Sequence, residues 1–417
     1  MLKKTVEDMC RKAKDASFIL ANTQENKKNA TLLYLKNLVD KNRKDIKKAN
    51  IIDVEYARKN NLNPALIDRL MLNDKRIDGI IESLDTIIKL KDPVGEVIEG
   101  YKLENSLNIE KVRVPIGVIG IIYESRPNVT IDAAALCLKS SNCSVLRGGK
   151  ESINTNKLLS GLIQEALQMS ELPEGCVNLI ENTDRKGVEY LIKMDKYLDL
   201  IVPRGGESLI KFVTENALVS VVKHDKGLCH TYVDEYADIS KAIDIAYNAK
   251  VQRPGVCNAM ETLLVHKNIA KEFLPNMAKK LTDAGVELRG CKKTKTILSN
   301  IADAKEEDWD IEYLDLVLSI KIVDSLEEAI DHINTHGSSH SEAIVTENYS
   351  NAEEFLNRVD AACVYVNAST RFTDGAIFGM GAEIGISTNK LHARGPVGLR
   401  ELTTYKYKIR GSGQIRE

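Results

Sequence analysis

The sequence predicts an α/β protein with two domains, each built on a parallel sheet. From residue 142 onward short apolar segments alternate with amphipathic ones, and strict alternation of strands and helices is typical of a doubly wound parallel sheet. A second run of the same alternation begins at residue 229, which predicts the second domain. The length of 417 residues is enough for two or more domains of roughly 100–200 residues each.

The first part of the chain reads as helices followed by a hairpin. Residues 30–50 and 64–90 repeat apolar side chains at spacings of three and four, which indicates amphipathic helices. Pro64 stands where the first turn of a helix tolerates a proline. Residues 97–122 then alternate apolar and polar side chains on both sides of LENSLN, which predicts a β-hairpin. A lone hairpin is marginal by itself, so we expect it to pack against something else.

Nine further strands are expected along the two alternating runs. They are at residues 142–149, 176–180, 198–206, 219–222, 229–234, 262–266, 314–323, 341–345 and 361–367. Two of them end in glycine pairs, Gly148-Gly149 and Gly205-Gly206. A glycine pair after a strand lets the backbone approach a phosphate at a helix start. The G-x-G-x-x-G fingerprint is absent, so ordinary tight turns remain an equal alternative.

The composition argues against nucleic-acid and membrane partners. Charged residues make up 28% of the chain with a formal net charge of −2, which does not suit binding to a polyanion. Aromatic residues are only 5%, too few for the stacking surfaces of single-strand binders. No apolar stretch approaches the ~18 residues of a spanning helix, and the charged first 20 residues lack the apolar core of a signal peptide. We therefore expect a cytoplasmic protein.

The eight cysteines are scattered and none forms a C-x-x-C pair, so we expect no disulfide framework. Cys137, Cys176 and Cys363 stand inside apolar stretches. We interpret each of these three as a small buried hydrophobe.

Cys257 differs from the other cysteines because it follows a polar corner, in QRPGVCNAMETLLVH. Pro254 and Gly255 make a rigid and then flexible turn. The thiolate is the nucleophilic form of cysteine, and a free thiol with a pKa near ~8.5 is only slightly ionised at neutral pH. The cation of Arg253 would raise the ionised fraction, and neighbouring backbone N–H groups stabilise an oxyanion. Cys257 is therefore the candidate nucleophile, and a structural cysteine is the alternative.

His332, His336 and His340 recur at every fourth position, which on one continuous helix would place three metal ligands on one face. Gly337 interrupts the pattern, and GSSH is typical of a helix end. We expect local hydrogen bonding and no metal.

The stretch around Cys257 resembles the nucleophile stretch of the gamma-glutamyl phosphate reductase family (glutamate-5-semialdehyde dehydrogenases), a branch of the aldehyde dehydrogenase superfamily. The resemblance runs over nearly the whole chain from about Val94, and AIDHINTHGSSHSEAI is a highly specific part of it. Met260 departs from the pattern, because a small residue is expected there. Other stretches that carry the resemblance are YESRPNVTIDAAALCLKSSN, LRGGKES, IVPRGG, YVNASTRFTDG, FGMGAEIGISTNKLHARGPVGL and ELTTYKYKIRG. It implies an aldehyde dehydrogenase-like fold.

The resemblance also implies a reaction. Members of the family reduce L-glutamyl 5-phosphate to L-glutamate 5-semialdehyde with NADPH and release phosphate, which is the second step of proline synthesis from glutamate. Cys257, with Asn258 beside it, would form the catalytic pair: the thiolate attacks the acyl phosphate, a thioester forms, and hydride from the nicotinamide yields a thiohemiacetal that collapses to the aldehyde.

One departure from the wider superfamily supports the reductive direction. Hydrolytic aldehyde dehydrogenases resemble one another in a Glu-Leu-Gly-Gly stretch whose Glu activates water on the thioester. The matching region here is VVKHDKGLCH, which has no Glu. We expect the thioester to survive long enough for reduction, or for attack by phosphate in the reverse reaction.

The resemblance assigns binding residues for cofactor and substrate. Arg147 and Lys150 would meet the adenosine ribose and its 2′-phosphate, with a solvated loop edge as the alternative. The pyrophosphate loop would be Pro203, Arg204 and Gly205, and Glu312 would bind the nicotinamide ribose. Arg126 and Arg371 would bind the substrate α-carboxylate, since a guanidinium matches a carboxylate bidentately; the alternative is that one of them binds the departing phosphate.

The expected domains follow from these assignments. Residues 1–98 and 113–225 would form the NADP-binding domain, residues 226–398 the catalytic domain, and residues 99–112 and 399–417 an oligomerisation arm that builds a homodimer or larger homo-oligomer. A separate glutamate 5-kinase is an expected partner. A hydrolytic aldehyde dehydrogenase and an inactive NADP-binding scaffold are the alternatives; the intact Cys257 loop speaks against the scaffold.

Overall fold

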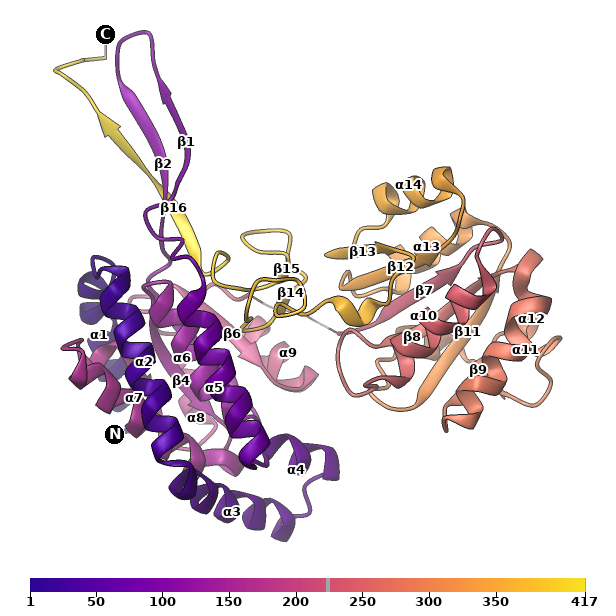
Figure 1. The fold of residues 1–417 in the computed structure, drawn as a ribbon, viewed down its shortest axis with the longest axis horizontal. Coiled ribbons are helices and arrows are strands. Elements are labelled where there is room, and N and C mark those ends of the chain that lie inside the picture. Colours follow the sequence, from indigo (N-terminus) through magenta and orange to yellow (C-terminus); the bar gives the residue numbers. More distant parts are fainter. Residues whose placement is uncertain (223–225, 417) are drawn as a thin grey trace. The chain divides into compact units, whose positions relative to one another are not determined.

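The computed structural model describes residues 1–222 and 226–416 (Figure 1). The chain divides into two compact units. Unit 1 comprises Met1–Lys223, Gly379–Gly385 and Pro396–Glu417, and unit 2 comprises His224–Phe378 and Ile386–Gly395. The short strands β14 (Ile386–Ser387) and β15 (Gly395–Pro396) lie where the chain passes between the units.

Unit 1 begins with the helices that the sequence predicts. They bury one apolar face each, as Leu32, Leu35 and Val39 show on the second helix. Their bounds are α1 (Leu2–Leu20), α2 (Glu25–Lys41), α3 (Arg43–Lys59), α4 (Pro64–Leu70) and α5 (Asp74–Lys89). Pro64 is the first residue of α4, where its missing N–H has no intrahelical partner to lose.

The sheet of unit 1 is parallel and has the strand order β5-β4-β3-β6. Every residue of its two central strands, β3 and β4, is buried, as expected for a sheet covered on both faces by helices. The strands are β3 (Val118–Tyr123), β4 (Cys143–Gly148), β5 (Val177–Leu179) and β6 (Leu200–Arg204), and the helices that follow them are α6 (Asn128–Lys139), α7 (Ile153–Met169), α8 (Lys186–Leu191) and α9 (Glu207–Asn216), with the 3₁₀ turns η1 (Lys150–Ser152) and η2 (Glu174–Cys176). The strand expected at residues 219–222 is wrong, because Val221 makes only an isolated bridge to Ile201.

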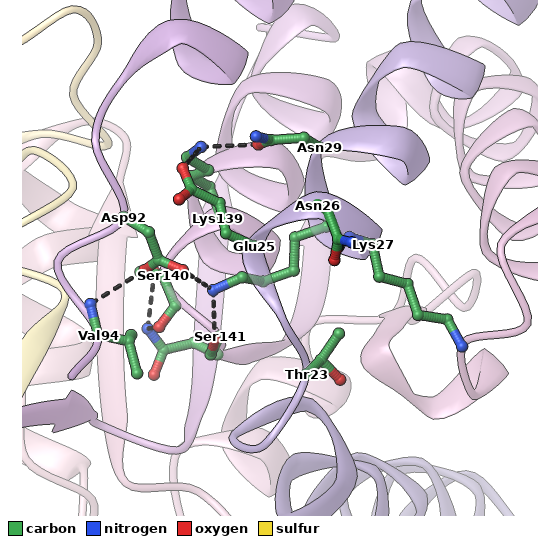
Figure 2. Close-up of polar contacts among 12 residues, drawn as sticks. Thr23, Glu25, Asn26, Lys27, Asn29, Asp92, Val94, Lys139, Ser140 and Ser141 are labelled. Carbon is green, nitrogen blue, oxygen red and sulfur yellow. Dashed lines mark hydrogen bonds and ion pairs between the residues drawn. The ribbon is translucent and has the colours of Figure 1, made fainter.

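Two buried lysines join α2 to the turns at the sheet (Figure 2). The ammonium of Lys28 donates to Asp92 and, at 2.7 Å, to the hydroxyl of Ser141. The ammonium of Lys139 donates to Glu25 at 2.8 Å and to Asn29 at 2.7 Å. Each buried cation thus has an acidic partner, which offsets the cost of removing it from water.

Three antiparallel strands extend from unit 1. They are β1 (Val97–Lys102), β2 (Asn108–Pro115) and β16 (Thr403–Arg410), in the order β1-β2-β16. The hairpin predicted from the alternation at residues 97–122 is confirmed for residues 97–115, and β16 pairs with β2 beside it. Residues 118–123 instead form β3 of the parallel sheet. Large apolar side chains on the antiparallel sheet are exposed; they are Val97, Ile98, Tyr101, Tyr405, Tyr407 and Ile409.

Unit 2 contains a seven-stranded parallel sheet in the order β10-β9-β11-β8-β7-β12-β13. Its strands are β7 (Cys229–Val233), β8 (Met260–His266), β9 (Glu287–Gly290), β10 (Ala302–Asp303), β11 (Val317–Val323), β12 (Ser341–Val345) and β13 (Cys363–Val366). Its helices are α10 (Ile239–Val251), α11 (Lys267–Asp283), α12 (Lys292–Lys295), α13 (Leu326–His336) and α14 (Tyr349–Arg358), with the turns η3 (Glu306–Asp310) and η4 (Thr370–Phe372). The sequence did not predict β9 and β10, which are short and rich in charge at the sheet edge.

Both sheets bear out the predicted fold class of parallel α/β units. None of the helices in the described ranges is long and apolar enough to cross a membrane.

Candidate active site

The Cys257 loop, residues 252–259, connects the end of α10 to the start of β8. An ion pair closes its base: the ammonium of Lys250 lies 2.6 Å from Oε2 of Glu261, and both side chains are 0% exposed. Lys250 lies in the last turn of α10, and Glu261 is the second residue of β8. The ion pair therefore holds together the two elements that the loop connects. Cys257 itself is half-buried.

The backbone of Cys257 packs against the segment that leads into β7. A Cβ atom at Gly227 would lie 2.2 Å from both the Cα and the carbonyl oxygen of Cys257, so only glycine allows this approach. The thiol of Cys229 donates to the same carbonyl at 3.2 Å. Two contacts from one segment therefore restrict where the Cys257 backbone can lie.

Asn258 is braced on both of its polar atoms. Its Nδ2 donates to the carbonyl of Thr373 at 2.8 Å, and its Oδ1 accepts from Arg371. Its own carbonyl accepts from the hydroxyl of Thr370 at 2.8 Å. The described contacts thus use Asn258 to shape the loop, and its expected part in the chemistry remains a prediction.

The cation of Arg371 lies within electrostatic reach of Cys257, and Arg253 lies within electrostatic reach of Arg371. Burial lowers the pKa of Arg371, Arg253 lowers it further, and the charge of the Cys257 thiolate raises it. The attraction is mutual, so the guanidinium favours the ionised thiol.

Five of the other seven thiols are buried, whereas Cys291 and Cys363 are half-buried like Cys257. Cys137 and Cys176 are buried as expected, and burial raises the pKa of Cys137 to about 12. Burial also raises the pKa of Cys229 well above its ordinary value, which leaves that thiol protonated and unreactive. The expectation that Cys363 is buried is wrong: it is half-buried, because β13 is an edge strand of its sheet.

Glu312 lies close to the base of the Cys257 loop. The carboxylate of Glu261 accepts from the backbone N–H of Leu314 at 3.2 Å, and Leu314 has a left-handed φ of 54°. Burial raises the pKa of Glu261 to about 7, and Glu312 is a smaller contributor in the same direction. The same buried carboxylate therefore touches the lysine below the loop and the segment that carries Glu312.

In unit 1 the loop after β6 binds a carboxylate oxygen. The N–H of Gly206, at the N-terminal end of α9, donates to Oε2 of Glu124 at 2.9 Å. A Cβ atom at Gly205 would lie 2.5 Å from the same oxygen. Pro203 and Arg204 end β6 directly before this corner. The backbone N–H at this helix N-terminus donates to an anionic oxygen, and a pyrophosphate would require the same kind of donor.

Arg147 and Lys150 occupy different positions. The guanidinium of Arg147 is 7% exposed and donates to the carbonyls of Gly148 at 2.7 Å, Thr183 at 2.8 Å and Asp184 at 3.3 Å. Lys150, at the start of η1, is exposed. Arg147 thus supports the loop at residues 183–184, and direct contact of either residue with a phosphate remains a prediction.

The glycine pair before Lys150 serves packing. A Cβ atom at Gly148 would lie 2.2 Å from Nδ2 of Asn156. This close packing explains the glycine at position 148, whereas the Gly205-Gly206 pair suits an anion.

Arg126 is half-buried in the loop between β3 and α6. The carboxylate of Glu151 accepts from the backbone N–H of Ser125 at 2.6 Å and from its hydroxyl at 2.9 Å. Ser125 has a left-handed φ of 41°, so Glu151 stabilises a strained turn directly before Arg126.

The histidines of the four-residue pattern do not share one helix. The helix α13 ends at His336, and His340 lies beyond Gly337. His336 bonds to Asp310 at 2.9 Å and His340 to the hydroxyl of Ser341 at 2.8 Å. Within residues 1–222 and 226–416 no group of His, Cys, Asp and Glu side chains is arranged to bind a metal ion.

Sequence reasoning missed the residues that support the site. Glu124, Gly227, Lys250 and Glu261 were not singled out. A charged residue inside an apolar strand start, as Glu261 is in METLLVH, was the available signal, because a buried charge requires a partner. The region that replaces Glu-Leu-Gly-Gly lies partly outside the described residues, at 223–225.

Comparison with known proteins identifies the class. A family model described as the aldehyde dehydrogenase family matches residues 2–316 and 294–406. The chain therefore belongs to the aldehyde dehydrogenase family. An acetylating aldehyde dehydrogenase from Geobacillus thermoglucosidasius shares the fold, with a TM-score of 0.71 at 18% identity over 100% of this chain and 98% of that one.

Two relatives and one solved structure, each more than 50% identical to this chain, are named gamma-glutamyl phosphate reductase. A gamma-glutamyl phosphate reductase from Nitratiruptor sp. is 59% identical over 99% of this chain and 100% of its own length. Another from Halothermothrix orenii is 54% identical over 100% of both chains. The crystal structure of the gamma-glutamyl phosphate reductase from Thermotoga maritima matches with a TM-score of 0.97 at 53% identity, over 99% of this chain and 100% of that one. The chain groups with these reductases.

Proposed function

We propose that this enzyme reduces L-glutamyl 5-phosphate to L-glutamate 5-semialdehyde with NADPH and releases phosphate, as the second step of proline synthesis from glutamate. The observation that carries the proposal is similarity over the full length of the chain to proteins named gamma-glutamyl phosphate reductase. The half-buried Cys257, on a loop held by polar contacts from three sides, supports it.

Cys257 supplies the nucleophile. Its thiolate attacks the acyl carbon, the C–O bond to phosphate breaks, and phosphate leaves with the bonding electron pair, so that a thioester to Sγ remains. Reduction of the thioester gives a thiohemiacetal, whose collapse releases the aldehyde and returns the electron pair to Sγ. Two easier steps replace one difficult step.

No glutamate stands in the stretch that corresponds to the Glu-Leu-Gly-Gly motif, so none is expected to activate water on the thioester. In the described part of the stretch that corresponds to the Glu-Leu-Gly-Gly motif, Gly227 and Cys229 lie directly against Cys257, and neither can activate water. This favours reduction, or phosphorolysis in reverse, over hydrolysis.

NADPH supplies the hydride when it is bound. The residues present suit it: Gly205 and Gly206 provide the anion-accepting corner behind Pro203 and Arg204, and Lys150 offers an exposed cation for the 2′-phosphate. Arg147 would hold the loop at residues 183–184 in place, and Glu312 would bind the nicotinamide ribose. An engineered glycolyl-CoA reductase of the same fold, with a TM-score of 0.70 at 16% identity, has been solved with bound NADP+.

Arg126 and Arg371 are the candidates for the substrate α-carboxylate. Each is half-buried on a loop whose neighbouring residues are held by hydrogen bonds, and a guanidinium suits a carboxylate better than an ammonium does. The assignment of one of them to the phosphate is the alternative.

The exposed apolar side chains of β1 and β16 support the proposal that the sheet of β1, β2 and β16 is an arm for self-association, since monomers seldom leave such a surface in water. A glutamate 5-kinase is the partner that would deliver the unstable acyl phosphate. The enzyme would work in the cytoplasm.

The test is an assay in the reverse direction. With glutamate 5-semialdehyde and NADP+, the reductase should form NADPH only when inorganic phosphate is added, because phosphate must cleave the thioester. A hydrolytic aldehyde dehydrogenase would form NADPH without phosphate. The phosphate-independent result would replace the proposal with that alternative, and no NADPH under either condition would favour an inactive binding protein.

A further inference from the structure

One guanidinium joins the two ends of the Cys257 loop. Arg371 donates from Nε to Oε1 of Gln252 at 2.9 Å and from Nη1 to Oδ1 of Asn258. Gln252 begins the loop and Asn258 directly follows Cys257. We propose that Arg371 is a positioning residue for the reaction, which closes the loop so that the Cys257 thiol is presented in one place. The inference rests on the proposed function, because it requires Cys257 to be the nucleophile.

The support for Arg371 is itself bound to the sheet of unit 2. The turn η4, which carries Arg371, ends at Thr373. The hydroxyl of Thr373 hydrogen-bonds to Ser341 on β12 at 2.6 Å and to Tyr365 on β13 at 2.7 Å. Ser369 caps the start of the same turn. The turn that carries Arg371 is thus fixed to two strands of the sheet, and Arg371 in turn is bonded to the loop.

Two sets of contacts hold the loop, and the bonds of Arg371 are the second of them. Lys250 and Glu261 close its base, as described above, and Arg371 joins Gln252 to Asn258 above it. A short loop that is held at its base and again across its two ends has few conformations left for Cys257. Correct placement matters because a displacement of about 1 Å in an active site costs on the order of 100-fold in rate.

An arginine suits this task better than a lysine. The guanidinium is planar and presents five N–H donors in set directions, so one group can reach acceptors on two residues. A lysine ammonium keeps the charge but cannot reproduce two donors in one plane. The two bonds use two of the five donors, so a contact with the substrate carboxylate is compatible with the bridge.

The charge of Arg371 acts together with the bridge. Because Arg371 and the Cys257 thiolate attract each other, the same group that holds the loop also favours the reactive form of the thiol. Lysine and glutamine substitutions separate the two contributions: Arg371→Lys keeps the charge and loses the bridge, and Arg371→Gln loses both.

The experiment measures Cys257 directly, without substrate or cofactor. The intact enzyme and its variants are alkylated with iodoacetamide across a range of pH, and the peptide that contains Cys257 is followed by mass spectrometry. We expect Arg371→Gln to move the midpoint of Cys257 alkylation up by about one pH unit, the lower end of the effect of a nearby opposite charge. Arg371→Lys should leave the midpoint within a few tenths of a unit. The control is Arg358→Lys, on a surface ion pair of α14.

Steady-state kinetics then separate positioning from substrate binding. We expect Arg371→Lys to lower kcat by about 10- to 100-fold with little change in KM for glutamate 5-semialdehyde. Gln252→Ala, which removes one end of the bridge and keeps Arg371, should lower kcat several-fold. If KM also rises in Arg371→Lys, Arg371 contacts the substrate in addition to positioning the loop.

Two results would overturn the inference. One is unchanged Cys257 alkylation in both Arg371 variants with an effect on KM alone, which assigns Arg371 to substrate binding only. The other is wild-type kcat in Arg371→Lys and in Gln252→Ala. Circular dichroism establishes that each variant is folded, and Gln252→Ala keeps the test available if the Arg371 variants do not fold. A failure of the proposed function is distinguishable, because the intact enzyme would then form NADPH without added phosphate or form none at all.

Discussion

Lys250 and Glu261 form an ion pair with no solvent exposure, at 2.6 Å, beneath the loop that carries Cys257. An isolated buried charge is strongly unfavourable, so each member of the pair depends on the other. The pair explains why a lysine ends α10 and a glutamate begins β8, although both positions face the interior of unit 2.

Removal of one partner should therefore destabilise the protein. We expect Lys250→Met to lower the free energy of unfolding by about 3–5 kcal/mol, measured by urea denaturation. Lys241→Met provides the control, since Lys241 pairs with Glu347 at the surface and exposed pairs contribute less than about 1 kcal/mol. Lys250→Met combined with Glu261→Gln should recover much of the loss. Equal effects at positions 250 and 241 would contradict this account.

The same substitution should make stability depend on pH. Burial raises the pKa of Glu261 to about 7, so the folded protein retains a proton there that an unfolded chain, with an ordinary glutamate pKa of 4.5, has released. Without Lys250, this contribution is fully present below about pH 4.5 and is lost as the pH rises through the folded-state value. We expect the loss in free energy of unfolding caused by Lys250→Met to be larger at pH 8 than at pH 5. A loss that becomes smaller from pH 5 to pH 8 would contradict this account.

Cys257→Ala should lose essentially all turnover, by more than about 1,000-fold, in the assay with phosphate and NADP+. Cys363→Ala and Cys291→Ala are the controls, since both thiols are half-buried in the same unit. These two variants should keep their activity and change stability at most. Comparable activity in Cys257→Ala would remove Cys257 from the mechanism.

Neutral residues at Arg147 and Lys150 should weaken the binding of NADPH far more than that of NADH. Charge-assisted hydrogen bonds contribute roughly 1.5–3 kcal/mol, and NADH lacks the 2′-phosphate that would receive them. The two substitutions should differ because Lys150 is exposed and Arg147 is buried. Lys150→Ala should weaken the binding of NADPH selectively, whereas Arg147→Ala should also destabilise the loop at residues 183–184. Equal losses for both cofactors in Lys150→Ala would count against the assignment.

Glu124→Gln should strengthen NADPH binding by about tenfold, or about 1.4 kcal/mol. The carboxylate of Glu124 accepts from Gly206 in the corner proposed for the pyrophosphate, so it competes with the cofactor and repels it. Fluorescence titration of bound NADPH measures the affinity without turnover. Glu215→Gln, at the other end of α9, is the control. Weaker binding in Glu124→Gln would mean that the carboxylate takes part in cofactor binding.

Deletion of residues 100–111, with a short linker in their place, should yield smaller assemblies with reduced activity. The deletion removes the exposed Tyr101 and the half of β2 that pairs with residues 407–410 of β16. Analytical ultracentrifugation at micromolar concentration is the measurement. Sedimentation of the intact chain as a monomer would refute the arm as an oligomerisation element.

The sequence predicted those parts of the molecule that local pattern determines. The alternation of strands and helices and the two-sided hairpin depend on nearby residues, and both were confirmed. The strand expected at residues 219–222 is reduced to one bridge, in which Ile201 on β6 bonds to Ser220 and Val222, because an apolar run does not reveal how far such pairing extends. The short strand β9 was missed for the converse reason, since its pairing with β11, and not its composition, makes it a strand.

The loop of Cys257 was predicted from its turn residues, but the contacts that shape it were not. Asn258 and Arg371 are 113 residues apart in sequence, and nothing local to either one indicates that they are bonded. The same limit applies to Arg147, whose charge suggested a phosphate, while its burial and its three carbonyl partners depend on how the sheet folds around it.

The distance along the chain between Cys257 and its braces has a consequence for the newly made protein. Translation proceeds from the N-terminus, so Cys257 leaves the ribosome well before Arg371 and Thr373 have been synthesised. Until then the thiol lies in an unsupported loop without the guanidinium that favours its ionised form. If Cys257 is the nucleophile as proposed, we expect the nascent chain to carry it as an ordinary cysteine until the second half of unit 2 is complete.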